Sequence, residues 1–267
     1  MSRYENIIYE KTDKGVAIIT FNRPEKMNSL NIGLLRELRE AMEDVVNNNA
    51  VRVLILTGKG RAFCAGADLK MVDDQYSETD GLDMDAEKLF HETANAAFGY
   101  VENCPKPVIA AVNGYAVAGG FEICLWSDLV IASESARIGD AHANYMLMGP
   151  ISVNLLPRQI GLKKSMELLL TGDMWPAAEL EKIGLVNKVV PDDKLMETAM
   201  EYATKIAERS PLGSRYVKSI VKQTTDAPRS VVNELAFSIL HHIALSKDRA
   251  EGVKAFAEKR KPNYTGE

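Results

Sequence analysis

Cysteine is scarce in this sequence: the 267 residues include three, Cys64, Cys104 and Cys124, and each has apolar neighbours. Three isolated cysteines do not provide the paired framework of a disulfide-stabilised secreted domain. We therefore expect buried thiols in a protein of the reducing cytoplasm. A reactive thiol at Cys64, next to Ala65-Gly66, is the alternative, but no neighbouring base in the sequence supports it.

Long apolar runs are also missing. The longest, such as Pro107–Val112, fall far short of the roughly 20 residues that a membrane-spanning helix needs. Met1–Glu10 is polar and mixed in charge, without the apolar core of a secretion signal. We therefore expect no membrane partner.

Basic residues are not in excess, since 32 Lys and Arg stand against 37 Asp and Glu, a formal net charge of −5. A surface that follows nucleic-acid phosphates usually needs a basic excess, so we expect no nucleic-acid partner. The sequence lacks a P-loop and a complete dinucleotide-binding glycine fingerprint. The adjacent His241-His242 would point about 100° apart on a helix. We therefore predict no metal site and no cofactor.

The composition is that of a globular protein, with 46% hydrophobic and 26% charged residues. Short apolar runs alternate with segments of helical spacing such as Asn31–Asn47. Near-continuous apolar runs are typical of strands covered by helices on both faces, so the sequence predicts an α/β fold. No convincing internal repeat is visible. The predicted strands are Val16–Phe21, Val51–Thr57, Lys106–Val112, Asp128–Ala132 and Gly184–Val190.

After Pro191 the pattern contains helices alone. We therefore predict an α/β core over residues 1–191 and a helical C-terminal domain over residues 192–267. Asp73–Asp85 is acidic, polar and contains glycine. It is a candidate for a mobile loop near a site, with a plain solvated surface loop as the alternative. The predicted C-terminal helices are Asp193–Arg209, Leu212–Gln223, Val231–Leu245 and Asp248–Lys259.

Two turns rich in glycine and alanine each follow a predicted strand and precede a predicted helix: Arg61–Lys70 and Gly114–Leu125. Small side chains let backbone N–H groups approach a ligand closely, and a helix N-terminus adds partial positive charge. Two such turns on neighbouring strands are suited to placing two N–H donors on one oxygen, which stabilises an enolate. The alternative is that the glycines only permit tight packing between strand and helix.

Several ordered blocks resolve that alternative, because together they resemble the crotonase superfamily, whose best-known member is enoyl-CoA hydratase. The resemblance covers essentially the whole chain. It implies a crotonase-type ββα spiral core with a C-terminal helical trimerisation domain, forming trimers that commonly pair into hexamers. The blocks are FNRPEKMNSL (Phe21–Leu30), GRAFCAGADLK (Gly60–Lys70), KPVIAAVNGYAVAGGFEICLWSDLVIAS (Lys106–Ser133), LLPRQIG (Leu155–Gly161), LTGDMWPAAELEKIGLVNKVVP (Leu170–Pro191) and EGVKAFAEKRKPNYTG (Glu251–Gly266).

The resemblance implies that Ala67 and Gly119 supply the two N–H groups of an oxyanion hole. Glu122 occupies the first of the two glutamate positions that hydratases use, where a carboxylate can hold a water and move protons. Apolar neighbours of Glu122 favour a raised pKa. The alternative for Glu122 is an acid in the first turn of a helix, stabilised by the helix dipole.

The sequence departs from the hydratase pattern at the second glutamate, where His142 stands instead. One residue is missing before Leu156, and Gly149–Asn154 replaces the usual glycine-rich turn. Three interpretations remain open. His142, with an ordinary pKa near 6.5, acts as the acid/base; or Asp140 takes that role; or the position only shapes the pocket and Glu122 acts alone.

The resemblance also assigns the substrate, a coenzyme A thioester. It places Arg23, Lys26 and Met27 along the CoA path and the backbone of Cys64–Leu69, which includes Ala65 and Asp68, beside the adenine and pantetheine. Phe256 and Lys259 resemble residues that reach the CoA of a neighbouring subunit. The alternative for Lys26 is a solvated surface lysine, and the alternative for Phe256 and Lys259 is a helix with one buried aromatic and one exposed lysine. The acyl pocket is expected to involve Met71–Phe98, Trp126, Tyr145, Met146 and Leu147.

The leading hypothesis is therefore a hydratase-like lyase that adds water to an α,β-unsaturated acyl-CoA. Double-bond isomerisation, decarboxylation and C–C hydrolysis are alternatives within the superfamily, and a catalytically silent CoA-binding scaffold is an alternative outside catalysis.

Overall fold

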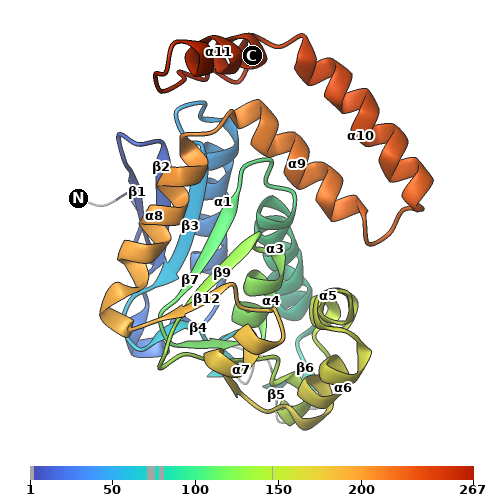
Figure 1. Ribbon diagram of the computed structural model, residues 1–267. Helices are drawn as coiled ribbons and strands as arrows, with labels where there is room; N and C mark the ends of the chain where they lie inside the picture. The colour runs from blue at the N-terminus through green and yellow to red at the C-terminus, as the bar shows by residue number, and fades with distance from the viewer. Residues whose placement is uncertain (1–2, 71–75, 78–80, 146) are drawn as a thin grey trace.

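The computed structural model describes residues 3–70, 76–77, 81–145 and 147–267. In these residues the chain forms a six-stranded sheet, a four-stranded sheet and a two-stranded hairpin, surrounded by helices (Figure 1). None of the helices in the described part of the chain is both long and apolar enough to cross a membrane. Residues 73–75 and 78–80 of the predicted loop at Asp73–Asp85 lie outside the described residues.

The strands of the large sheet lie side by side in the order in which they occur along the chain. The first pair is antiparallel and all the others are parallel. The predicted strand Val16–Phe21 has the predicted bounds, whereas Gly184–Val190 is a strand only at its end, because Gly184 has a positive φ of 84° and turns the chain. The strands are β1 Ile7–Lys11, β2 Val16–Phe21, β3 Val53–Gly58, β7 Val108–Val112, β9 Leu129–Ser133 and β12 Lys188–Val190.

The apolar runs of these strands are continuous because both faces of the sheet are covered. Leu54 and Leu56 of β3 point into a core shared with α1 and α3, whereas Val53 and Ile55 point into a second core shared with α8. Successive side chains of a strand face opposite sides, so burial on both faces needs an apolar residue at every position. This confirms the predicted α/β class.

The small sheet consists of short strands, three of which directly follow strands of the large one, whereas β11 follows α6. Its order is β11-β10-β8-β4, and β8 pairs in parallel with both β4 and β10. The chain thus runs three times from a large-sheet strand to a small-sheet strand and then to a helix, although the sequence shows no repeat. The short strands are β4 Ala62–Cys64, β8 Tyr115–Val117, β10 Arg137–Gly139 and β11 Trp175–Pro176, and the hairpin is β5 Tyr76–Ser77 with β6 Gly81–Leu82.

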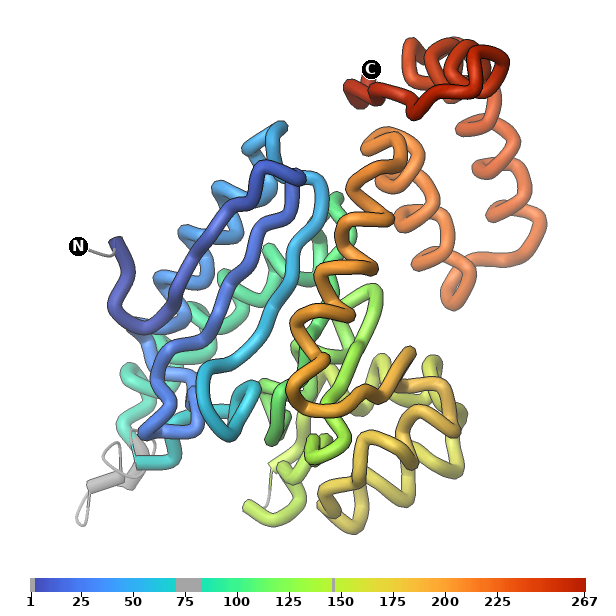
Figure 2. The backbone as a smooth tube through the Cα atoms, turned by 60° about the vertical axis from the view of Figure 1, so that its left-hand side comes forward, coloured from blue at the N-terminus to red at the C-terminus, as the bar shows by residue number. Residues whose placement is uncertain are grey.

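The helices divide into those that cover the sheets and those that leave them. α8 lies after the predicted boundary at residue 191, yet Ala199 and Ala203 of α8 pack into the second core. α9 to α11 extend beyond the end of the sheet (Figure 2), and α10 has no buried residue. The helices are α1 Ile32–Asn47, α3 Met84–Glu102, α4 Gly119–Trp126, α5 Pro150–Ile160, α6 Leu162–Thr171, α7 Ala177–Lys182, α8 Leu195–Ala207, α9 Pro211–Gln223, α10 Arg229–Ala244 and α11 Lys247–Ala257, with short 3-10 turns η1 Pro24–Lys26, η2 His142–Tyr145 and η3 Asp192–Lys194.

Candidate active site

The two glycine- and alanine-rich turns lie against each other, and glycine is what lets them do so. A Cβ on Gly120 would stand 2.1 Å from the carbonyl oxygen of Cys64, so α4 touches β4 backbone to backbone. A Cβ on Gly66, whose φ is 82°, would stand 3.4 Å from the amide nitrogen of Gly119. The turn after β4 and the first residue of α4 are therefore direct neighbours. The short strands β4 and β8, which the sequence did not reveal, hold this contact together.

Among the residues that the structure describes, the amides of Ala67 and Gly119 are both without an acceptor. On either side of Ala67, the Leu30 N–H donates to Gly66 O at 2.7 Å and the Asp68 N–H donates to Leu30 O at 3.0 Å. The Ala67 N–H itself makes no hydrogen bond to any described residue. Gly119 is the first residue of α4, so its N–H has no partner within the helix. Two unused donors thus come from adjoining segments.

The backbone that leads into α4 is strained. Ala118 has φ 49° and ψ −115°, a conformation that side chains other than glycine rarely adopt. Its N–H donates to Gly139 O at 3.2 Å, which ties the entry of α4 to the end of β10. Such strain costs about 1–3 kcal/mol and persists only where the surroundings enforce it. Here it aims the first turn of α4 at the neighbouring turn.

Glu122 lies one helical turn into α4 and is 6% exposed. Its Oε1 accepts a hydrogen bond from the Ile151 N–H of α5 at 3.1 Å. Burial raises the pKa of Glu122, and the nearby His142 opposes that rise. A buried carboxyl with a raised pKa can exchange a proton near neutral pH, as general acid/base chemistry requires.

Asp140 and His142 form a pair directly after β10. Asp140 Oδ1 lies 3.0 Å from His142 Nδ1 and accepts a hydrogen bond from the His142 backbone N–H at 3.1 Å. Burial works against the charge of both groups, but their mutual contact outweighs it, so the pKa of Asp140 is lowered and that of His142 is raised. Ala141 between them has a positive φ of 56°. Glu122, Asp140 and His142 are thus brought into one electrostatically linked cluster, called the acid group below.

The predicted CoA-binding segments are also adjacent in part. Arg23 Nη2 lies 3.0 Å from Asp68 Oδ2 and the Ala65 N–H donates to Met27 O at 3.1 Å. The charge of Arg23 is therefore already matched by Asp68. Lys26 and Leu69 are exposed beside them.

Phe256 and Lys259 lie elsewhere. Phe256 belongs to α11, where it is 86% exposed, and Lys259 follows that helix. α11 stands at the opposite end of the molecule from β4 and α7 (Figure 1). Within a single chain these two residues do not join the other predicted site residues.

The thiol of Cys64 is unsuited to nucleophilic chemistry. It is completely buried, and burial raises its pKa to about 12. All three cysteines are free and buried. Cys64 therefore contributes its backbone and its packing to the turn.

The residues predicted for the acyl pocket are only partly described. Met71 and Met146 lie outside the described residues, while Tyr145 and Leu147 are exposed near His142. Trp126 is buried one helical turn beyond Glu122, with its indole ring centre 5.1 Å from that of Phe98.

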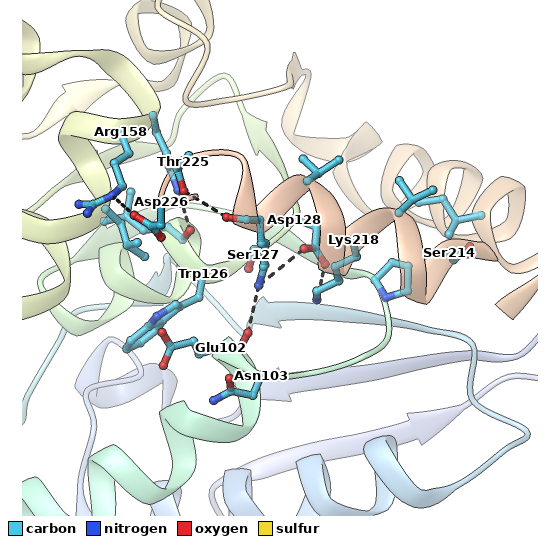
Figure 3. A pocket seen from close by; sticks show the side chains of 18 residues that line it. Glu102, Asn103, Trp126, Ser127, Asp128, Arg158, Ser214, Lys218, Thr225 and Asp226 are labelled. Carbon is cyan, nitrogen blue, oxygen red and sulfur yellow. Dashed lines mark hydrogen bonds and ion pairs between the residues drawn. The ribbon is translucent and has the colours of Figure 1, made fainter. Parts of the chain in front are cut away.

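A cavity of about 630 Å³ opens at the far end of α4, between α3, α5 and α9 (Figure 3). Trp126, Asp128 and Lys218 are among the residues that line it, whereas Glu122 and His142 are not. Lys218 Nζ lies 2.6 Å from Asp128 Oδ2, and Arg158 Nε lies 3.1 Å from Asp226 Oδ1. Two ion pairs thus line this cavity.

Two residues at the acid group were not assigned a role from sequence: Gly149 and Ser152. Both are buried in the first turn of α5 or just before it, against Asp140 and His142. The Gly-Pro pair that opens the helix was visible in sequence, since proline favours the first turn. The contact with Asp140 depends on how α5 folds back, which no local pattern encodes.

Comparison with known proteins places the chain in a large group of relatives. The family described as enoyl-CoA hydratase/isomerase matches residues 11–267. A probable enoyl-CoA hydratase of Mycobacterium bovis is 35% identical, and a crotonyl-CoA hydratase of Syntrophomonas wolfei is 36% identical, each alignment covering 98% of both chains. The crystal structure of an enoyl-CoA hydratase from Bacillus anthracis superposes with a TM-score of 0.91 at 36% identity, covering 98% of this chain and 100% of the other. The predicted crotonase-type fold is thereby confirmed.

Proposed function

Because the chain belongs to the enoyl-CoA hydratase/isomerase family, we propose that it is a hydratase-like lyase that adds water to α,β-unsaturated acyl-CoA. One observation carries this proposal: the amides of Ala67 and Gly119, which have no acceptor among the described residues, lie in adjoining turns, and the buried carboxyl group of Glu122 follows one helical turn after Gly119. Donors for a developing oxyanion and a group that moves protons are the two requirements of hydration through an enolate.

The amide pair takes the charge. As the water oxygen bonds to C3, the electrons of the C2–C3 double bond move toward the thioester, whose carbonyl oxygen becomes negative. The N–H groups of Ala67 and Gly119 donate to that oxygen. Loss of one such donor costs about 3–4 kcal/mol of transition-state stabilisation in other enzymes. The two turns therefore carry the largest share of the catalysis.

The acid group moves the protons. Ionised Glu122 accepts a proton from the attacking water, and protonated His142 donates one to C2. Asp140 keeps His142 charged, since its contact raises the pKa of His142. A histidine–aspartate pair here does the work of the second glutamate, and its imidazolium also compensates the charge of Glu122.

The CoA moiety lies along the turn after β4. Arg23, Lys26 and Met27 border this path, with Cys64, Ala65, Asp68 and Leu69 along its other side. Exposed Lys26 is available to a phosphate, whereas Arg23 is paired with Asp68 and stiffens the turn. The reaction requires no cofactor beyond the CoA thioester itself.

The active unit is a homotrimer, which can pair into a hexamer, and it works in the cytoplasm. Large apolar side chains are exposed on α9 to α11, among them Phe237, Leu240 and Leu245. Burying them against a second copy is favourable. Phe256 and Lys259 then reach the CoA of a neighbouring subunit. Three free, buried cysteines fit a reducing compartment.

The test is hydration of crotonyl-CoA, followed by the loss of its conjugated thioester absorbance. Glu122→Gln keeps the shape of the side chain but removes its charge, so kcat should fall about 100- to 10,000-fold. Glu201→Gln, at an exposed position of α8, is the matched control and should keep the wild-type rate. Near-wild-type activity of Glu122→Gln would refute the role of Glu122. Binding of a broad acyl-CoA panel without turnover would favour a scaffold.

A further inference from the structure

Three buried polar atoms at the acid group lie close enough to interact with one another, yet their arrangement falls short of ideal hydrogen-bond geometry. They are Asp140 Oδ2, His142 Nδ1 and Ser152 Oγ, and none has a partner in good hydrogen-bond geometry among the described residues. Ser152 is 0% exposed and Asp140 2%. A buried polar group left unpaired is costly. Three of them in one place therefore indicate a network that matters for function.

The three atoms converge on Gly149. A Cβ built on Gly149 would stand 2.5 Å from Asp140 Oδ2, 2.7 Å from His142 Nδ1 and 2.9 Å from Ser152 Oγ. Glycine is thus the residue that leaves space at the centre of the group. The Ser152 hydroxyl is therefore a close neighbour of Asp140 Oδ2 and His142 Nδ1.

The first turn of α5 reaches both halves of the acid group. The Ile151 N–H donates to Glu122 Oε1 at 3.1 Å, and the next residue, Ser152, faces Asp140. One turn of helix therefore sets the position of Glu122 relative to His142. This turn belongs to the segment Gly149–Asn154, which stands where the family resemblance led us to expect a glycine-rich turn.

We propose that Ser152 is a positioning residue whose hydroxyl donates to Asp140 Oδ2 and fixes the rotation of that carboxylate. Oδ1 is then held against His142 Nδ1, and Nε2 is left as the nitrogen that works on the substrate. A carboxylate that accepts a hydrogen bond from one ring nitrogen keeps the proton on that nitrogen, so the other nitrogen of the neutral imidazole is unprotonated. This inference rests on the proposed function for the use of Nε2, but the positioning itself can be measured without turnover.

Ser152 is not a nucleophile in this arrangement. A serine activated by histidine faces the ring nitrogen opposite the one that binds the carboxylate. Here Ser152 Oγ and Asp140 Oδ2 cluster with the same nitrogen, Nδ1. The complete burial of Ser152 also keeps it from an acyl carbonyl.

The titratable groups that face His142 are Glu122 from α4 and Asp140 from the end of β10. The test therefore reads His142 directly, by histidine-selective ¹⁵N labelling and NMR of the full-length protein over a pH series. The chain has four histidines, and His142→Gln identifies the signal of His142. In the wild type, neutral His142 should carry its proton on Nδ1.

Ser152→Ala should convert this single tautomer to a mixture dominated by Nε2–H, as in free imidazole. Ser152→Thr keeps a hydroxyl and should retain the wild-type pattern. Ser165→Ala is the matched control, because Ser165 is equally buried in α6 and its Oγ donates to Gly161 O at 2.8 Å. An unchanged tautomer in Ser152→Ala, or an equal change in Ser165→Ala, would overturn the proposal.

Kinetics give the second measurement. Ser152→Ala should lower kcat for crotonyl-CoA roughly tenfold, the effect of losing one ordinary hydrogen bond, and leave KM unchanged. A rise in KM at constant kcat would mean that Ser152 only shapes the pocket, which overturns the proposal. If the wild type hydrates no enoyl-CoA, the proposed function fails, yet the tautomer experiment still decides the role of Ser152.

Discussion

An acid lies near each end of α4, and the two differ in their surroundings: Glu122 is buried, whereas Asp128 is half-buried. Glu122, near the start of the helix, belongs to the acid group with Asp140 and His142. Asp128, just beyond the end of the helix, belongs to the cavity of Figure 3. Both acids lie near a cation and next to a backbone N–H group. The two acids differ in how fully hydrogen bonds and ion pairs satisfy their carboxylate oxygens.

Asp128 is fully engaged. Its Oδ2 accepts from the Val108 N–H at 2.8 Å and from Lys218 Nζ at 2.6 Å, and Lys218 Nζ also donates to Lys106 O at 2.9 Å. At Glu122 the Ile151 N–H and the Ser152 amide both favour the charged carboxylate, yet burial outweighs them and raises its pKa. The neighbouring side chains of Asp140, His142 and Ser152 include buried polar atoms with no partner in good hydrogen-bond geometry among the described residues. A satisfied buried charge holds elements together, whereas an unsatisfied one is available for chemistry.

The largest effect on this contrast is expected from a substitution of Lys218, the ion-pair partner of Asp128. Lys218→Met removes one partner of a pair whose lysine side chain is only 9% exposed, so the free energy of unfolding should fall by about 3 kcal/mol. Because this pair lies outside the acid group, kcat of the remaining folded enzyme should not change. Urea unfolding and a kcat measurement on the same preparation decide this. Lys222→Met, at a distance of 4.0 Å from Asp128, is the control with a small expected effect, and a large loss of kcat in Lys218→Met would contradict the distinction.

Gly149→Ala tests the acid group through the reaction rate, whereas Lys218→Met tests the Asp128 pair through stability. Its methyl group would stand 2.5 Å from Asp140 Oδ2, so Asp140 or His142 must shift. A displacement of about 1 Å in a catalytic group lowers the rate about 100-fold. Steady-state kinetics with crotonyl-CoA measures the change.

Gly99→Ala is the control for that substitution, because a Cβ on Gly99 of α3 meets nothing within 4 Å. It should leave the rate unchanged and stabilise the protein by up to ~1 kcal/mol, as alanine does in a helix interior. Equal rates for Gly149→Ala and Gly99→Ala would show that the space at Gly149 has no catalytic importance.

The smallest expected effect is on the pH dependence of kcat/KM, which should depend on the acid group of Glu122 and not on Asp128. Glu122 must be ionised and His142 protonated, so the rate should follow a bell-shaped curve. Its acid limb should lie above the ordinary glutamate value of 4.5, and its alkaline limb above the ordinary histidine value of 6.5, because both pKa values are raised. The two limbs belong to the coupled group rather than to single residues.

His142→Gln should remove the alkaline limb, whereas Asp128→Asn should leave the shape of the curve unchanged. An alkaline limb that persists without His142 would assign the donated proton to another group.

Sequence patterns predicted the parts of this fold that are long or locally specified. Strands such as Val16–Phe21 are covered on both faces and are apolar at nearly every position, which makes them conspicuous. The paired turns around Gly66 and Gly119 were also visible, because close backbone contact requires glycine. Strands of three residues, such as Ala62–Cys64, are too short to show an alternation. They came to light only in the structure.

The missed site residues have a different physical reason. Ser152 contacts Asp140 because η2 and α5 fold back toward the end of β10, and nothing in the residues around Ser152 records that path. A lone serine in the first turn of a helix is ordinary in sequence. Its burial beside two ionisable groups is what distinguishes it.

The threefold repetition of strand, short strand and helix separates the tasks of the site along the chain. The first unit presents the amide of Ala67, the second presents Gly119 with Glu122, and the third brings Asp140 and His142 under α5. A substitution in the third unit can therefore redirect a proton while the amides of the first two, which we propose bind the thioester oxygen, stay in place. Divergence of reaction type in such a scaffold needs changes in one unit alone, at little risk to the recognition of the thioester.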